Sequence, residues 1–195
     1  MLQILTPATT GNLTTLDTVK QDLKITDSSQ DVILNRLILE ASSKITSYCR
    51  RTTFGSESLR QIEYGPLPCV VLARDLDPVI SLVTVDGNAT TDYELDGSLL
   101  YRMASNSRTT WESGRILIEY TAGYVLLGNL PPAVERACLD TIKHLYFNTD
   151  RDAQLKGEKV LDIIEQSWST SGQYELGLPA GVSEALTPFM LEVIV

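Results

Sequence analysis

Residues 16–51, LDTVKQDLKITDSSQDVILNRLILEASSKITSYCRR, decide the fold of this chain. In the second half of this stretch, apolar residues recur at three- and four-residue steps, which places them on one stripe of a long helix. The stripe comprises Leu34, Leu37, Ile38, Ala41, Ile45, Tyr48 and Cys49. A shorter helix is predicted over residues 15–24, with Leu16, Val19 and Leu23 on one face. The pattern predicts a helical hairpin whose long helix packs against another part of the chain.

Local signals predict where the long helix begins and ends. Ser28 followed by Asp31 resembles a capping box, because it supplies a side-chain acceptor and a carboxylate near the positive end of the helix dipole. Arg50 and Arg51 are expected in the last turn, where the dipole favours cations.

A second long helix is predicted to begin at Pro131 and Pro132, because proline suits the first helical turn. Its apolar stripe comprises Val134, Ala137, Cys138, Thr141, Ile142, Leu145 and Tyr146. We expect this stripe to pack on the long helix of the hairpin.

Residues 56–124 have the pattern of an antiparallel β-module, with short β-rich runs between turn signals. The runs are LRQIEY, CVVLA, VISLVTV, YEL, SLLYRM and RILIEY. Asp96-Gly97 predicts a hairpin, because both residues tolerate the positive φ of a type I′ turn. Trp111 falls in a loop of this module, where it serves either as an interface anchor or as half-buried packing.

The sequence therefore predicts an α+β fold. The helical core, a helical hairpin plus a later long helix, takes residues 1–55 and 125–151, and the antiparallel β-module 56–124 is inserted into it. Residues 152–195 are predicted to form an extended C-terminal arm.

The C-terminal arm is apolar and acidic at once. From Glu158 to Val195 it has one Lys and six acidic residues. It is too apolar for a disordered tail, and it has too little periodicity to form its own core. It therefore packs along its own subunit or buries apolar residues against a partner. The candidate residues for an interface with a partner are Trp168, Phe189, Met190, Leu191, Val193, Ile194 and Val195.

The net charge of −9 is unevenly distributed. Residues 1–55 carry +1, whereas 56–130 and 131–195 carry −5 each. A protein that grips DNA needs a basic patch, and only Arg50-Arg51 comes close to one, so tight DNA binding is disfavoured. No apolar run predicts a membrane span, and the N-terminal residues lack the pattern of a signal peptide. Buried, reduced thiols in a protein that folds in the cytoplasm are expected for Cys49, Cys69 and Cys138.

The residue inventory does not favour an enzyme, a cofactor or a metal site. His144 is the only histidine, and it lies six positions from Cys138, on the opposite face of the predicted helix. Three cysteines and one histidine without paired spacing are a poor zinc site. The alternating Asp92, Glu94 and Asp96 are either a calcium site or, more commonly, solvated edge charges. No glycine-rich phosphate loop is present.

The ordered set of segments resembles the phage head-tail connector, or adaptor, family in its longer form, with a β-rich insertion between the helices. The resemblance rests on LDTVKQDLKI and VILNRLILEASSKITSYCRRT, then IEYTAGY, LPPAVERACLDTIKHLY and LPAGVSEALTPFM. It covers nearly the whole chain. The sequence departs from the family pattern at Tyr146–Arg151 and in the terminal FMLEVIV.

The resemblance implies a structural virion protein without catalytic, cofactor or metal sites. Such a subunit forms a homo-oligomeric ring, a dodecamer in the family, in the neck under the portal protein. The ring continues the DNA channel, lets DNA pass without sequence-specific binding, and docks the next stopper or tail protein. Two alternatives remain: a neck stopper (head-completion) protein that retains DNA, and a soluble acidic accessory or regulatory domain that binds a basic partner.

Overall fold

The chain folds into two compact units. The β unit comprises Met1–Thr10 and Thr53–Asn129, and the helical unit comprises Gly11–Thr52 and Leu130–Val195. The computed structural model describes residues 1–149, 157–160, 164–167, 178–179 and 181–191. The sequence-based boundary assigned all of residues 1–55 to the helical core. Residues 1–10 instead belong to the β unit, because they contribute a strand to it.

The helical hairpin at the start of the helical unit is confirmed. The first helix, α1 (Leu16–Leu23), begins after Thr15, whose Oγ1 accepts a hydrogen bond from Thr18 N at 3.0 Å. It ends at Lys24, which has a left-handed φ of 58°. The long helix, α2, spans Asp31–Tyr48.

Asp31 lies in the first turn of α2 as predicted, but the side-chain cap from Ser28 and the cations expected in the last turn are wrong. Gln30 occupies the N-cap position and makes no side-chain capping bond, while Ser28 contributes only its carbonyl oxygen, which accepts from Asp31 N. The Asp31 carboxylate instead pairs with Lys20 Nζ of α1 at 2.8 Å. At the other end, Arg50 lies beyond the helix with a φ of 55°. The carboxylate of Asp31 therefore also joins α2 to α1 and stabilises the hairpin.

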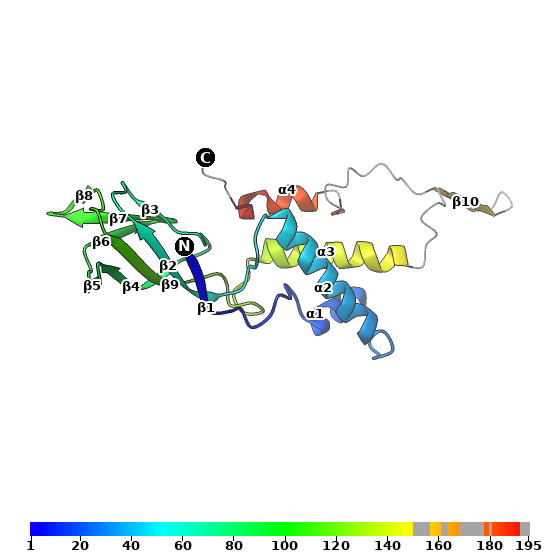
Figure 1. Cartoon of the computed structure of the whole chain (residues 1–195). Coiled ribbons are helices and arrows are strands. Elements are labelled where there is room, and N and C mark those ends of the chain that lie inside the picture. The colour runs from blue at the N-terminus through cyan, green and yellow to red at the C-terminus, as the bar shows by residue number, and fades with distance from the viewer. Residues whose placement is uncertain (150–156, 161–163, 168–177, 180, 192–195) are drawn as a thin grey trace. The chain divides into compact units, whose positions relative to one another are not determined.

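The predicted packing of the second long helix, α3 (Pro132–Thr149), on α2 is confirmed, and Figure 1 shows the two helices crossing. Their buried residues include Leu34, Leu37, Ile38, Ala41, Ile45, Val134, Ala137, Cys138 and Ile142. Leu145 and Tyr146 are only half buried. Lys143 Nζ of α3 lies 2.8 Å from Asp22 Oδ2 of α1, so an ion pair joins these two helices.

The C-terminal part of the helical unit contains short elements. They are α4 (Val182–Leu186), the 3₁₀ helix η1 (Thr187–Phe189), and the antiparallel pair β10 (Gly157–Val160) and β11 (Ile164–Ser167). Among the described residues, no helix has both the length and the apolar content that a membrane span requires.

The β unit contains two antiparallel sheets. The five-stranded sheet has the order β1 (Leu2–Thr6), β2 (Glu57–Tyr64), β9 (Arg115–Ala122), β4 (Val79–Val85) and β5 (Asn88–Ala89). The four-stranded sheet joins β3 (Val70–Val71), β7 (Leu99–Ala104) and β6 (Tyr93–Asp96), with β8 (Ser107–Thr109) also paired to β7. Buried residues from both sheets form one core that includes Leu59, Val83, Leu100, Ile116 and Ile118. The predicted β-rich runs are thus strands, and β1, β5 and β8 are additional to them.

The predicted hairpin between β6 and β7 is confirmed, but its turn has a different register. Asp96 pairs with Leu99, so Gly97 and Ser98 are the central residues, and Gly97 has a φ of 59°. A turn with positive φ at both central residues occurs instead between β4 and β5, where Asp86 has a φ of 50° and Gly87 of 85°.

Trp111 is a core residue of the β unit. Its side chain is buried, and its Nε1 donates a hydrogen bond to Leu100 O at 3.0 Å. The interpretation of Trp111 as an interface anchor is therefore wrong. The loop signal at this position gave no indication of the burial, because the two sheets enclose the indole ring from distant parts of the sequence.

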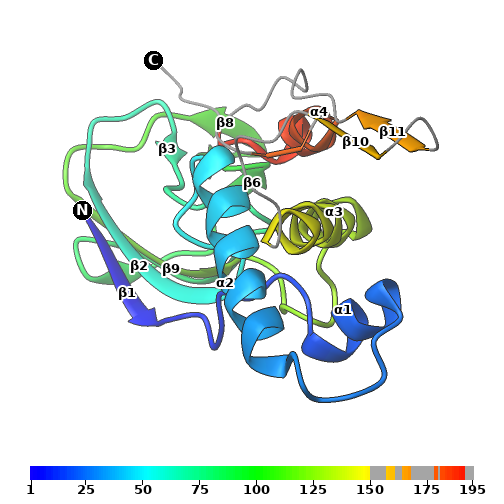
Figure 2. The ribbon, with the colours of Figure 1, turned by 90° about the vertical axis from the view of Figure 1, so that its right-hand side faces the viewer.

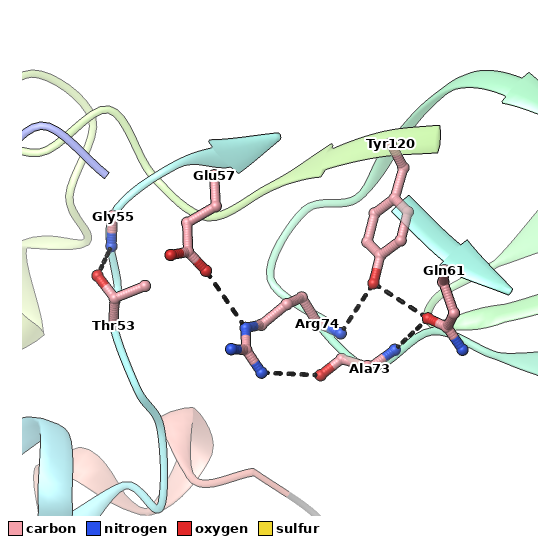
Figure 3. A network of polar contacts seen from close by, with 7 residues as sticks. All are labelled: Thr53, Gly55, Glu57, Gln61, Ala73, Arg74 and Tyr120. Atoms are coloured by element: carbon pink, nitrogen blue, oxygen red, sulfur yellow. Dashed lines mark hydrogen bonds and ion pairs between the residues drawn. The ribbon is translucent and has the colours of Figure 1, made fainter. Parts of the chain in front are cut away.

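A buried polar network fixes the segment between β3 and β4 to the five-stranded sheet (Figure 3). Gln61 Oε1 accepts from Ala73 N at 2.9 Å and from Tyr120 Oη at 3.2 Å, and Gln61 Nε2 donates to Val71 O at 2.8 Å. Arg74 Nε lies 3.4 Å from the buried Glu57 carboxylate. The satisfied amide of Gln61 therefore holds three separate segments in register.

Candidate functional site

The C-terminal segment is the candidate site that the sequence predicted, and its stretch around α4 and η1 packs on the other helices of the unit. Leu178, Val182 and Leu186 are buried, and α4 contacts α3. Figure 2 shows α4 beside the C-terminal end of α2. The described residues from Leu178 to Leu191 are therefore not an extended arm, because three buried side chains bind them to their own subunit.

Two backbone contacts fix the end of this segment. Leu191 N donates to Cys49 O at 2.9 Å, and Arg51 Nε donates to Phe189 O at 2.6 Å. Tyr48 Oη also donates to Ser183 O at 3.3 Å. The last turn of α2 and the residues that follow it therefore satisfy carbonyl and N–H groups of α4 and η1.

The predicted interface residues fall into two groups. Phe189, Met190 and Leu191 are half buried and lie together after α4. Trp168, Val193, Ile194 and Val195 lie outside the described residues. The described part of the predicted interface is thus the edge formed by η1 and by Met190 and Leu191, which follow it.

Sequence reasoning overlooked a second surface, on α2. Val32, Ile33 and Leu39 are large apolar side chains on the exposed side of this helix. Phe147, near the end of α3, is also exposed. The signal was available, because these residues are apolar but do not belong to the buried stripe that predicted the helix.

The thiols and the single imidazole do not form a nucleophilic pair. Burial raises the pKa of the Cys138 thiol to about 12 and that of Cys49 to about 11, so both are protonated at neutral pH. Cys138 Sγ lies 3.8 Å from Ser42 Oγ, whereas the His144 ring lies 3.1 Å from Asn148 Nδ2. Burial and the nearby Lys44 lower the pKa of His144.

The alternating carboxylates at residues 92–96 are occupied by arginines. Arg108 Nη2 lies 2.8 Å from Glu94 Oε1 and 3.0 Å from Asp96 Oδ2, and its hydrogen bond lowers the pKa of Glu94. Asp92 lies 3.6 Å from Arg102. Within the described part of the chain, no three His, Cys, Asp or Glu side chains are grouped as metal ligands would be. These contacts favour surface ion pairs over the calcium interpretation.

Comparison with protein families identifies a match in the first part of the chain. Residues 13–86 match the family model described as phage gp6-like head-tail connector protein. The predicted resemblance is thus confirmed over residues 13–86, a range that includes the whole hairpin of α1 and α2. No curated protein matches the chain.

Solved structures from a gene transfer agent (GTA) share the fold over the whole chain. A chain from the virion of the native GTA particle has a TM-score of 0.58 and 13% identity, with 100% of this chain and 97% of that chain covered. A chain from the neck of the native particle, computed with C12 symmetry, has a TM-score of 0.55 and 13% identity at the same coverage. A chain from the neck of the empty particle, computed with C6 symmetry, has a TM-score of 0.54, 15% identity and again the same coverage. These likenesses show the predicted α+β fold.

Proposed function

We propose that this chain is a structural neck protein of a phage-like particle, an adaptor whose copies form a ring under the portal. The match of residues 13–86 to the head-tail connector family carries the proposal. The fold supports it, because similar chains occur in GTA necks, one of them described with C12 symmetry. A ring of twelve copies in the virion neck, assembled after folding in the host cytoplasm, is the arrangement that we infer.

The ring continues the portal channel and lets DNA pass without gripping it. The net charge of −9 disfavours phosphate binding. Four of the five arginines of the β unit add little attraction, because Arg60, Arg74, Arg102 and Arg108 each pair with a carboxylate. An acidic surface repels DNA and so prevents it from sticking.

The C-terminal segment supplies contacts to the portal or to a neighbouring subunit. Its anchor on Cys49 and Arg51 fixes the position of Phe189 and Leu191 on the helical unit. Met190, Val193, Ile194, Val195 and Trp168 complete the proposed interface, which then docks the ring between the portal and the next stopper or tail protein.

Two truncations test this role of the C-terminal segment. Deletion from Pro188 onward removes the anchored edge together with the apolar terminus, whereas deletion of residues 192–195 removes only the terminus and leaves the anchor in place, so the comparison separates the two contributions. We expect both proteins to fold, because Leu178, Val182 and Leu186 remain buried, and we expect the longer deletion to yield heads without tails. Circular dichroism checks folding, and electron microscopy of particles counts attached tails. Normal tailed particles from the longer deletion would show that the segment is dispensable.

Two measurements separate the adaptor from its alternatives. Native mass spectrometry of the full chain is expected to show a closed ring, whereas a soluble accessory domain would stay monomeric. Cryo-electron microscopy of particles then distinguishes an adaptor, which contacts the portal directly, from a stopper, which lies one layer below it.

A further inference from the structure

The exposed side of α2 carries an apolar surface with an unpaired cation, here called the α2 face and comprising Val32, Ile33, Arg36 and Leu39. Val32 is 84% exposed, Leu39 is 60% exposed and Ile33 is 41% exposed. Val32, Arg36 and Leu39 are spaced four and three residues apart, so they lie along one line of the helix. Arg36 is exposed and has no carboxylate partner among the described residues.

An exposed aromatic residue lies at the same end of the helical unit, on α3. Tyr146 Oη donates to Gln30 Oε1 at 2.6 Å, which places the C-terminal end of α3 beside the start of α2. The next residue, Phe147, is 70% exposed. Large exposed apolar side chains are typical of a protein interface, and aromatic residues are enriched there.

A second surface of the helical unit has the opposite charge. This surface, the α4 face, comprises Glu184, Ala185, Pro188 and Phe189. Glu184, Ala185 and Pro188 are exposed, while Phe189 is half buried, and Val182 and Leu186 point the other way into the core. Among the described residues Glu184 has no cation partner. The two faces therefore match in kind, since each combines apolar side chains with one unpaired charge of opposite sign.

The two faces lie at opposite ends of α2 and cannot satisfy each other within one copy. The α4 face is tied to the C-terminal end of the helix by the contacts of Cys49 and Arg51, whereas the α2 face lies in its N-terminal half. A helix of 18 residues is about 27 Å long. Figure 2 shows α4 beside one end of α2 and α1 beside the other. Different surfaces at opposite ends of a subunit suit a head-to-tail contact, which closes into a ring when the rotation closes.

We propose that the α4 face of each copy docks on the α2 face of the next copy, with Glu184 paired to Arg36 of its neighbour. The contact buries Val32 and Leu39 under the edge formed by Pro188 and Phe189. The partner is a second copy of this chain, and the inference rests on the ring proposed above. It goes further by naming the two surfaces that meet and the charge pair that fixes how each subunit is oriented against the next one.

Charge reversal in the full-length protein tests this contact. Arg36→Glu and Glu184→Arg are each expected to lower the fraction of protein in rings by about tenfold or more at equal concentration, because each places like charges opposite one another. The double variant restores the pair in the reverse sense and is expected to recover the ring. Lys24→Glu makes the same change of charge as Arg36→Glu at an exposed residue outside both faces, and should leave the ring intact. Native mass spectrometry gives the ring fraction, and circular dichroism confirms that each variant is folded.

The outcomes separate this contact from the ring itself. A wild-type ring that persists in both single variants would overturn the contact and leave the proposed function standing. Loss of the ring in the single variants without recovery in the double variant would overturn the pairing of Arg36 with Glu184. A wild-type chain that stays monomeric would count against the ring and the contact together.

Discussion

Leu37→Ala tests the contact between α2 and α3 on which the helical unit depends. Leu37 is only 3% exposed, and it lies on the α2 stripe that packs on α3. Truncating a buried leucine to alanine removes the transfer free energy of the lost atoms and leaves a cavity, at a cost of about 2–5 kcal/mol. Against a total stability of about 5–15 kcal/mol, this loss is severe but need not unfold the protein.

Two other leucines of the helical unit calibrate the effect. Leu145 is half buried, so Leu145→Ala should cost less than Leu37→Ala. Leu39 lies two positions from Leu37 on the same helix but is 60% exposed, so Leu39→Ala should change the stability of a monomeric sample by no more than about 0.5 kcal/mol. Sequence reasoning alone treats Leu37→Asp and Leu145→Asp as equally destructive. Since Leu145 is half buried, a carboxylate there can reach water, and only Leu37→Asp is expected to abolish folding.

Thermal unfolding followed by circular dichroism measures these differences. For a chain of this length, each kcal/mol should lower Tm by about 2–4 °C. The sample should be dilute enough for the wild type to be monomeric, because assembly would add its own stability. The order Leu37, Leu145, Leu39 is expected from the largest loss to the smallest. Equal melting temperatures for Leu37→Ala and the wild type would refute the proposed packing of α2 on α3.

Three further predictions concern the buried network, the imidazole and DNA. Tyr120→Phe removes the bond donated to Gln61 and the long bond accepted from Arg74 N, and should cost about 1–2 kcal/mol. Gln61→Leu leaves several buried groups unpaired and should cost about 2–4 kcal/mol. Urea unfolding measures both variants, and a Gln61→Leu cost no larger than that of Tyr120→Phe would contradict the network. His144 has a folded-state pKa below its usual 6.5, so its protonation favours unfolding; His144→Asn should therefore lose less stability than the wild type as pH falls from about 7 to 5. Duplex DNA should be retained weakly at low salt and released as salt rises, and a nanomolar Kd in a filter assay at physiological salt would argue for DNA recognition.

The helices were predictable because their signal is local and periodic. Leu34, Leu37 and Ile38 recur at helical spacing, and the same residues are buried against α3. The signals at the helix ends were weaker, because a charged side chain has several possible partners. Asp31 lies in the first turn of α2 and also pairs with Lys20 of α1, a contact set by the hairpin that its own helix does not predict.

The β unit was predictable in kind but not in its edges. Runs such as RILIEY form the central strand β9, where alternate residues are buried. The strand β1 was missed because most of its residues are exposed, so Leu2–Thr6 shows no alternation that marks one face. Its pairing with β2 joins residues about sixty positions apart, and such a contact leaves no trace in a local window.

The surfaces proposed for assembly are the places where the local pattern and the folded subunit disagree. In the described part of the subunit, nothing covers the apolar residues Val32 and Leu39, and no oppositely charged partner lies beside Arg36 or Glu184. A sequence that specifies one structure usually agrees with it at every level, so such disagreements concentrate where function imposes another requirement. The helical unit would be more soluble with a polar residue at position 32 or 39. We therefore expect that Leu39→Gln increases the solubility of the isolated chain and lowers its capacity to form rings, and that the two effects appear together.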